Sequence, residues 1–190
     1  MTLLIVGIVA FLGLHFLPAF PHMREGLIER VGKNAYRGVF SLLSLVSFAL
    51  LVWGFAVAPV IQVWTPPPWT RWVAIVLMLP AFILLVAAYV PGQIKARVKN
   101  PFLIAIKIWA LAHLIANGDL ASIILFGSFL AYAVCDRIAL KHRQPTALVE
   151  TPGAGSARND MIAVVFGVLI FVVFLIWLHP LLIGRAVVLS

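Results

Sequence analysis

Six long apolar stretches run through this sequence and restrict what the chain can fold into. They cover residues 2–20, 39–62, 72–89, 102–116, 120–139 and 161–183, with more polar segments between them. A helix needs about 20 mainly apolar residues to cross the hydrocarbon core of a bilayer, and it satisfies its backbone hydrogen bonds internally. The sequence therefore predicts an all-α fold, a polytopic membrane helix bundle with about six transmembrane helices in contact with the lipid bilayer.

The composition leaves little room for anything besides these helices. Hydrophobic residues make up 64% of the chain and charged residues 11%, whereas an ordinary soluble domain has about 45–50% and 25%. Six crossings would use about 120 residues, so we expect a single integral membrane domain over residues 1–190. The stretch 144–159, which contains Pro and Gly, is typical of a flexible connector on the cytoplasmic side.

Basic residues fall in alternate connections between the predicted spans. Eleven of the 14 Lys and Arg residues lie in the first, third and fifth connections: Arg24, Arg30, Lys33, Arg37, Lys95, Arg97, Lys99, Arg137, Lys141, Arg143 and Arg158. Because membrane proteins concentrate Lys and Arg in cytoplasmic loops, both termini should lie on the periplasmic side of a bacterial inner membrane. This topology accounts for the formal charge of +8, so the charge gives no reason to expect nucleic-acid binding.

The fourth stretch is the shortest, and the residues that follow it predict how it ends. Asn117 and Gly118 supply a helix stop, and Asp119 followed by Ser122 has the pattern of an N-cap for the next helix. Helices over 102–116 and 120–139 should therefore form a tight antiparallel hairpin.

The sequence lacks the residue patterns of a water-soluble enzyme. A single cysteine, Cys135, excludes an internal disulfide and a zinc site built on cysteine clusters. The six acidic residues are spread over loops and helix ends, with no pair spaced for acid and base catalysis. A hydrolase is therefore disfavoured.

Ionisable side chains are costly inside a bilayer, which draws attention to His15 and His113. At about 1.5 Å per residue from the ends of their helices, both histidines come within several Å of mid-depth. Two neutral imidazoles on facing helices can hold a haem iron from opposite sides, so this pair is a candidate cofactor site. The alternative for each histidine is a structural hydrogen bond to a neighbouring helix, worth about 0.6 kcal/mol.

Four further residues are candidates for the same site, and two of them, Lys107 and His179, have a structural alternative. Lys107 lies about 9 Å from the inner end of its helix and can extend to the membrane surface, which is the alternative to a counter-ion role. His179 precedes a proline near the outer end of the last span, where an interfacial cap is the alternative to a ligand. Trp109 shares a helix face with His113, and Asn117 follows one turn later.

Three segments of the chain resemble the NnrU family of bacterial membrane proteins. They are residues 13–18 (GLHFLP), 32–45 (GKNAYRGVFSLLSL) and, most specifically, 108–129 (IWALAHLIANGDLASIILFGSF). The family is associated with denitrification and nitric oxide metabolism, and it is similar to the plant 15-cis-zeta-carotene isomerase, a membrane enzyme that uses haem b. The resemblance implies haem b as cofactor, with the iron ligands at His15 and His113.

Two positions depart from the patterns of these relatives. Ala110 stands where the isomerase has a cysteine, three residues before the histidine that corresponds to His113. An exchange between thiolate and imidazole ligands is therefore not available in this chain. Asn100 stands where many relatives have the histidine of an Arg-His-Pro motif, and an asparagine cannot supply the proton or metal chemistry of histidine. The Arg-His-Pro motif is also similar to isoprenylcysteine methyltransferases, so the two departures speak against both isomerase and methyltransferase activity in this chain.

Three functions remain open at this point. The resemblance favours an inner-membrane haem-b protein with an accessory role in nitric oxide, denitrification or respiratory metabolism, working with membrane proteins of those pathways. One alternative is a haem-dependent isomerase of an apolar polyene, such as a carotenoid, that enters from the lipid. The other is a scaffold or transporter without a cofactor, in which the histidines are purely structural.

Overall fold

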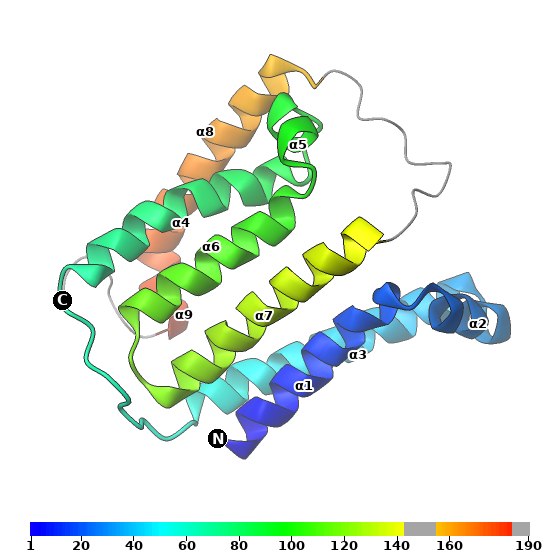
Figure 1. Cartoon of the computed structure of the whole chain (residues 1–190), viewed down its shortest axis with the longest axis horizontal. Helices are drawn as coiled ribbons and strands as arrows, with labels where there is room; N and C mark the ends of the chain where they lie inside the picture. The colour runs from blue at the N-terminus through cyan, green and yellow to red at the C-terminus, as the bar shows by residue number, and fades with distance from the viewer. Residues whose placement is uncertain (143–154, 184–190) are drawn as a thin grey trace. The chain divides into compact units, whose positions relative to one another are not determined.

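The computed structural model describes residues 1–142 and 155–183, and helices make up most of this part of the chain (Figure 1). Contacts within the chain divide these residues into two compact units. The first unit comprises residues 1–65 and 117–142, and the second comprises residues 66–116 and 155–183.

The first unit is built on three long helices. Its elements in chain order are α1 (Thr2–Phe16), the 3₁₀ turn η1 (Leu17–Ala19), α2 (Pro21–Val31), α3 (Lys33–Ala56) and α7 (Leu120–His142). Helix α1 packs along α3 and also contacts α7 (Figure 1). The short α2 packs on its neighbours in sequence, η1 and α3.

Two glycines allow α1 and α3 to approach closely. A Cβ atom on Gly7 would lie 2.6 Å from the backbone Cα of Leu51, and one on Gly54 would lie 2.5 Å from the backbone nitrogen of Leu4. Leu4 is completely buried. Small residues at such crossings bring helix backbones together in membranes, where association depends on close packing rather than on the hydrophobic effect.

The segment before α7 is held by backbone hydrogen bonds to the connection that follows α3. The carbonyl oxygen of Gly118 accepts hydrogen bonds from the N–H groups of Val63 and Trp64, at 2.8 and 3.1 Å. Asp119 accepts hydrogen bonds from the backbone N–H and the side-chain hydroxyl of Ser122, at 2.9 and 2.7 Å. The predicted N-cap of this helix is therefore confirmed.

The second unit contains the remaining helices. They are α4 (Thr70–Ala87), α5 (Gln93–Val98), α6 (Pro101–Ala116), α8 (Ala157–Val173), the π-helical segment η2 (Phe174–Leu178) and α9 (His179–Ile183). Helix α4 packs against both α6 and α8. A Cβ atom on Gly167 of α8 would lie 2.6 Å from the backbone Cα of Ile83, so α4 and α8 also approach closely.

The start of α8 corrects one sequence prediction. The hydroxyl oxygen of Ser156 accepts a hydrogen bond from the N–H of Arg158 at 3.2 Å and caps the helix, which begins at Ala157. The last three residues of the predicted connector 144–159 are therefore helical, because a serine N-cap starts the helix before the apolar run begins. Residues 144–154 of that connector lie outside the described part of the chain.

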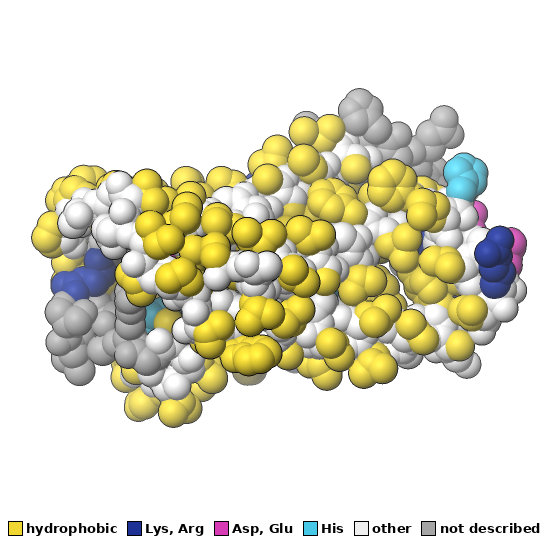
Figure 2. Space-filling model, turned by 90° about the horizontal axis from the view of Figure 1, so that it is seen from below, with side chains coloured by type: hydrophobic (Ala, Val, Ile, Leu, Met, Phe, Trp, Pro, Cys, Tyr) yellow, Lys and Arg dark blue, Asp and Glu magenta, His cyan; other side chains and the backbone are white. Residues whose placement is uncertain are grey.

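The helices agree with the predicted membrane character. Five are long and apolar enough to cross a bilayer, namely Thr2–Ala19, Lys33–Ala56, Thr70–Ala87, Leu120–Leu140 and Ala157–Ile183, and the apolar α6 is shorter. Their outward-facing side chains are mostly Leu, Ile, Val and Phe, and hydrophobic side chains predominate on the face seen in Figure 2. An exposed surface of this kind suits lipid as its solvent.

The side on which each connection lies is a prediction that reporter fusions can test. A reporter fused after Arg143 should indicate the cytoplasm, and one fused after Ser190 should indicate the periplasm, because basic clusters stay on the cytoplasmic side. Alkaline phosphatase, active in the periplasm, and green fluorescent protein, fluorescent in the cytoplasm, should give opposite signals at each point. A cytoplasmic signal after Ser190 would contradict the arrangement with six spans.

Candidate functional site

His15 lies one residue before the end of α1, with its imidazole anchored to its own helix. Its Nδ1 atom lies 2.7 Å from the carbonyl oxygen of Phe11. Because a carbonyl can only accept, Nδ1 carries the proton and Nε2 carries the lone pair of the neutral ring. The rings of Phe11 and Phe40 lie beside the imidazole, with centroids 4.2 and 5.7 Å from it.

His113 of α6 has the same arrangement in the second unit. Its Nδ1 lies 2.8 Å from the carbonyl oxygen of Trp109, four residues earlier, and the two rings are 5.4 Å apart between centroids. The backbone carbonyl again selects the tautomer with the lone pair on Nε2. A metal-ligating histidine is usually held in this way, by a hydrogen bond from its second ring nitrogen to a carbonyl or carboxylate.

Further aromatic rings surround His15. The Phe11 ring also lies near the rings of Phe48 and Phe129, at 5.7 and 5.9 Å between centroids. The Tyr132 hydroxyl donates a long hydrogen bond of 3.4 Å to the backbone carbonyl of His15. This region of the first unit therefore offers an imidazole among mainly apolar, aromatic side chains, as a flat apolar cofactor requires.

His179 belongs to the same unit as His113. The Phe174 ring stands edge-on to His179, with 6.1 Å between the ring centroids. His179 directly follows the π-helical segment η2, a rare feature that inserts an extra residue into a helical turn and occurs often at functional sites. In the sequence, only the proline at position 180 indicates that the helix is irregular here.

The structure therefore groups some of the predicted site residues. Trp109, His113 and His179 belong to the second unit, where the rings of Trp109 and His113 lie beside each other, whereas His15 belongs to the first. Lys107 is half-buried on α6. Asn117 follows α6 directly in the chain, at the beginning of the second part of the first unit.

Ala110, one of the departures from relatives, is completely buried in α6. Ala112 is buried to the same extent, and α6 packs mainly on α4. At the position where the isomerase has a cysteine, this chain therefore has an alanine whose methyl group is enclosed by the packed helices, with little room for a larger side chain.

A haem and a bare metal ion require different numbers of protein ligands. Within residues 1–142 and 155–183, no three His, Cys, Asp or Glu side chains gather into a group that could hold a metal ion. A structural zinc site needs about four protein ligands, whereas a haem macrocycle fills four positions itself and needs only one or two axial ligands. Single imidazoles with a fixed tautomer fit the second requirement.

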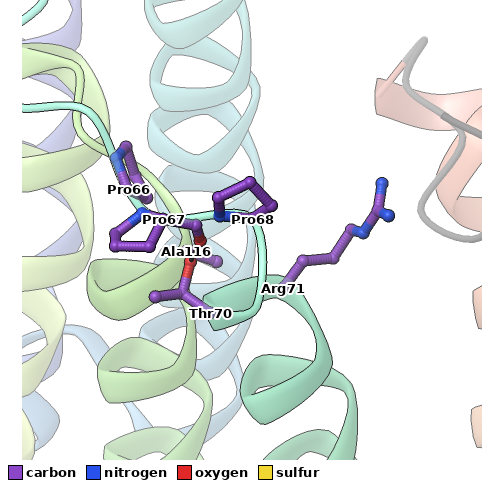
Figure 3. Close-up of a pocket in the computed structure, with 6 residues that line it drawn as sticks. All are labelled: Pro66, Pro67, Pro68, Thr70, Arg71 and Ala116. Carbon is purple, nitrogen blue, oxygen red and sulfur yellow. Dashed lines mark hydrogen bonds between the residues drawn. The ribbon is translucent and has the colours of Figure 1, made fainter.

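A separate hollow of about 310 Å³ lies in the second unit, lined by Pro66, Pro67, Pro68, Thr70, Arg71 and Ala116 (Figure 3). The Thr70 hydroxyl donates to the Pro67 carbonyl at 2.7 Å, so it serves the local turn. Arg71 extends away from the other five residues in Figure 3, and its guanidinium carbon lies 5.3 Å from the centre of the Trp72 ring. The hollow is therefore explained as part of the structure at the start of α4.

Comparison with known protein families gives a match to the family described as NnrU protein, over residues 3–187. Neither the curated proteins nor the solved structures include a match. The family match spans both units and includes the histidines and all of the helices described above. The chain is therefore a multi-pass membrane protein that belongs to the NnrU family.

Proposed function

We propose that this protein binds haem b in the bacterial inner membrane, with the imidazoles of His15 and His113 as axial ligands. The observation that carries the proposal is the shared geometry of the two histidines. Each donates from Nδ1 to the carbonyl oxygen four residues earlier, at 2.7 and 2.8 Å, and each thereby keeps the lone pair on Nε2. The family resemblance, which implies the same two ligands, supports the assignment independently.

The residues around the histidines have defined roles in this proposal. The carbonyls of Phe11 and Trp109 hold each imidazole in one tautomer and orientation, so little freedom is lost when a ligand bond forms. The Phe11 and Phe40 rings supply apolar surface beside His15. Haem held by His15 and His113 would supply a redox-active iron, which suits an accessory role in nitric oxide, denitrification or respiratory metabolism.

The visible absorption spectrum of the purified protein tests this proposal. Protein extracted in mild detergent from cells with sufficient haem should show a low-spin b-type spectrum, with one haem for each chain. The pyridine haemochrome assay identifies the haem type and gives the ratio. Protein that stays colourless after reconstitution with haem would favour a scaffold or transporter without a cofactor.

We expect the chain to bind haem without isomerising 15-cis-zeta-carotene. Isomerisation of a polyene at a haem iron needs an open coordination position, and two fixed imidazoles leave none. Ala110 offers no thiolate for ligand exchange. Co-expression with a carotenoid pathway that lacks this isomerisation step, followed by chromatography of the pigments, should show no conversion.

The variant Ala110→Cys tests whether the absence of a thiol at this position is what prevents isomerisation. Since Ala110 is completely buried, the sulfur has to displace neighbouring side chains of the second unit, and we expect no gain of activity. Conversion by the unmodified protein would show that the ligand-exchange argument is wrong, and the isomerase would then replace the accessory role.

A further inference from the structure

Helix α2 connects two membrane-spanning helices at the end where the basic residues gather. Only the three residues of η1 and Phe20 separate it from α1, and only Gly32 separates it from α3. Gly32 has a φ of 82°, which turns the chain out of α2 and into α3, and Figure 1 shows α2 lying across the ends of these two helices. The connections are so short that α2 has to lie at the membrane surface.

Three exposed apolar residues of α2 form a stripe along one face. Met23, Leu27 and Val31 follow one another at four-residue spacing and are 59%, 39% and 53% exposed. Phe20, just before the helix, is also exposed, at 56%. The packing of α2 on η1 and α3 leaves this stripe uncovered, although its neighbours in the chain are membrane spans.

The charged residues of α2 are sorted around this stripe. At 3.6 residues per turn, Arg24 and Arg30 lie about 60° to either side of Leu27. Glu25 and Glu29 lie about 160° to either side of it, on the opposite face. All four charged side chains are exposed. Both cations therefore lie beside the apolar stripe and both anions lie away from it.

We propose that α2 lies flat in the lipid head-group layer and forms a binding surface for anionic phospholipids. The stripe from Met23 to Val31 dips between the acyl chains, Arg24 and Arg30 bind lipid phosphate groups on its two sides, and Glu25 and Glu29 face water. Lys33 and Arg37, exposed in the first turns of α3, extend the positive surface. This arrangement supplies an anchor that is independent of any haem.

The depth of individual residues in a membrane tests the orientation of α2. The full chain carries one native cysteine, exposed Cys135, so Cys135→Ser gives a background for spin labels at introduced cysteines. Met23→Cys, Leu27→Cys and Val31→Cys report on the stripe, and Glu25→Cys and Glu29→Cys report on the opposite face. The vesicles contain phosphatidylcholine and phosphatidylglycerol in a ratio of 3 to 1.

Labels on the stripe should collide readily with oxygen, which dissolves in lipid, and poorly with a water-soluble nickel complex. Labels at positions 25 and 29 should show the reverse. If all five labels collide equally with the nickel complex, α2 lies in water and the proposal is wrong. If the stripe labels are shielded from both reagents, a protein surface covers them, which also refutes lipid as the partner.

A pair of double variants tests the choice of anionic lipid. Arg24→Gln with Arg30→Gln removes the flanking cations, and Glu25→Gln with Glu29→Gln is the matched control on the same helix. We measure the preference of the reconstituted protein for spin-labelled phosphatidylglycerol over phosphatidylcholine. The preference should fall by about fivefold for each arginine removed and should be unchanged or increased in the control.

Two outcomes complete this test. Arg24→Lys with Arg30→Lys keeps the positive charges and should retain most of the preference, which separates loss of charge from damage to the helix. An arginine-to-glutamine variant that elutes normally in size-exclusion chromatography and keeps the full preference would overturn the proposal.

Discussion

Replacement of His113 by alanine should remove the low-spin haem signal of the purified protein. His15→Ala should have the same effect, because a six-coordinate low-spin iron needs both imidazoles, and loss of either leaves a five-coordinate high-spin iron or releases the haem. The measurement is the visible spectrum together with the ratio of haem to protein. His22→Ala in α2, which removes an exposed histidine, should change neither quantity.

His179 is the most informative comparison in this series. It belongs to the same unit as His113 and follows the π-helical segment η2, so it is the alternative to His15 that the experiment has to test. With His15 and His113 as the ligands, His179→Ala should leave a low-spin spectrum. If His179→Ala loses that signal while His15→Ala keeps it, the ligand pair is His113 and His179, and our assignment is wrong.

The membrane spans could be predicted because the hydrophobicity of about 20 successive residues adds up along the chain, whatever their contacts. Each of the six apolar stretches has its helix, and the pattern around Asp119 and Ser122 correctly gave the start of α7. Helix α2 was missed because it has only 11 residues, four of them charged. The mean hydropathy of such a segment resembles that of a polar loop. Its pattern becomes visible only when each side chain is assigned to a helix face.

The candidate site could be predicted only as a list of residues. The sequence identifies His15 and His113 by their depth in the membrane, but the orientation of an imidazole depends on a side-chain rotamer that spacing does not determine. The spatial relation of His113 to His179 depends on how α6 and α8 pack around α4, and the two residues are 66 positions apart in the chain. No local pattern encodes that relation.

Gly7→Ala and Gly54→Ala should each destabilise the first unit by about 1–3 kcal/mol, the usual cost of forcing extra atoms into a packed interface. The new methyl groups would lie 2.6 Å from the Cα of Leu51 and 2.5 Å from the backbone nitrogen of Leu4, and backbone atoms cannot rotate away as a flexible side chain can. Helices α1 and α3 therefore have to move apart. Unfolding of the purified protein with increasing dodecyl sulfate, followed by circular dichroism, measures the loss.

The same two helices supply matched controls. A methyl group added at Gly13 of α1 or at Gly38 of α3 would meet no heavy atom within 4 Å, so Gly13→Ala and Gly38→Ala should leave stability unchanged or slightly raised, since alanine favours the helix. Equal losses at all four positions would show that helix propensity, rather than the crossing, controls stability. The double variant Gly7→Ala with Gly54→Ala should lose less than the sum of the single losses, because the first methyl group already separates the helices that the second would push apart.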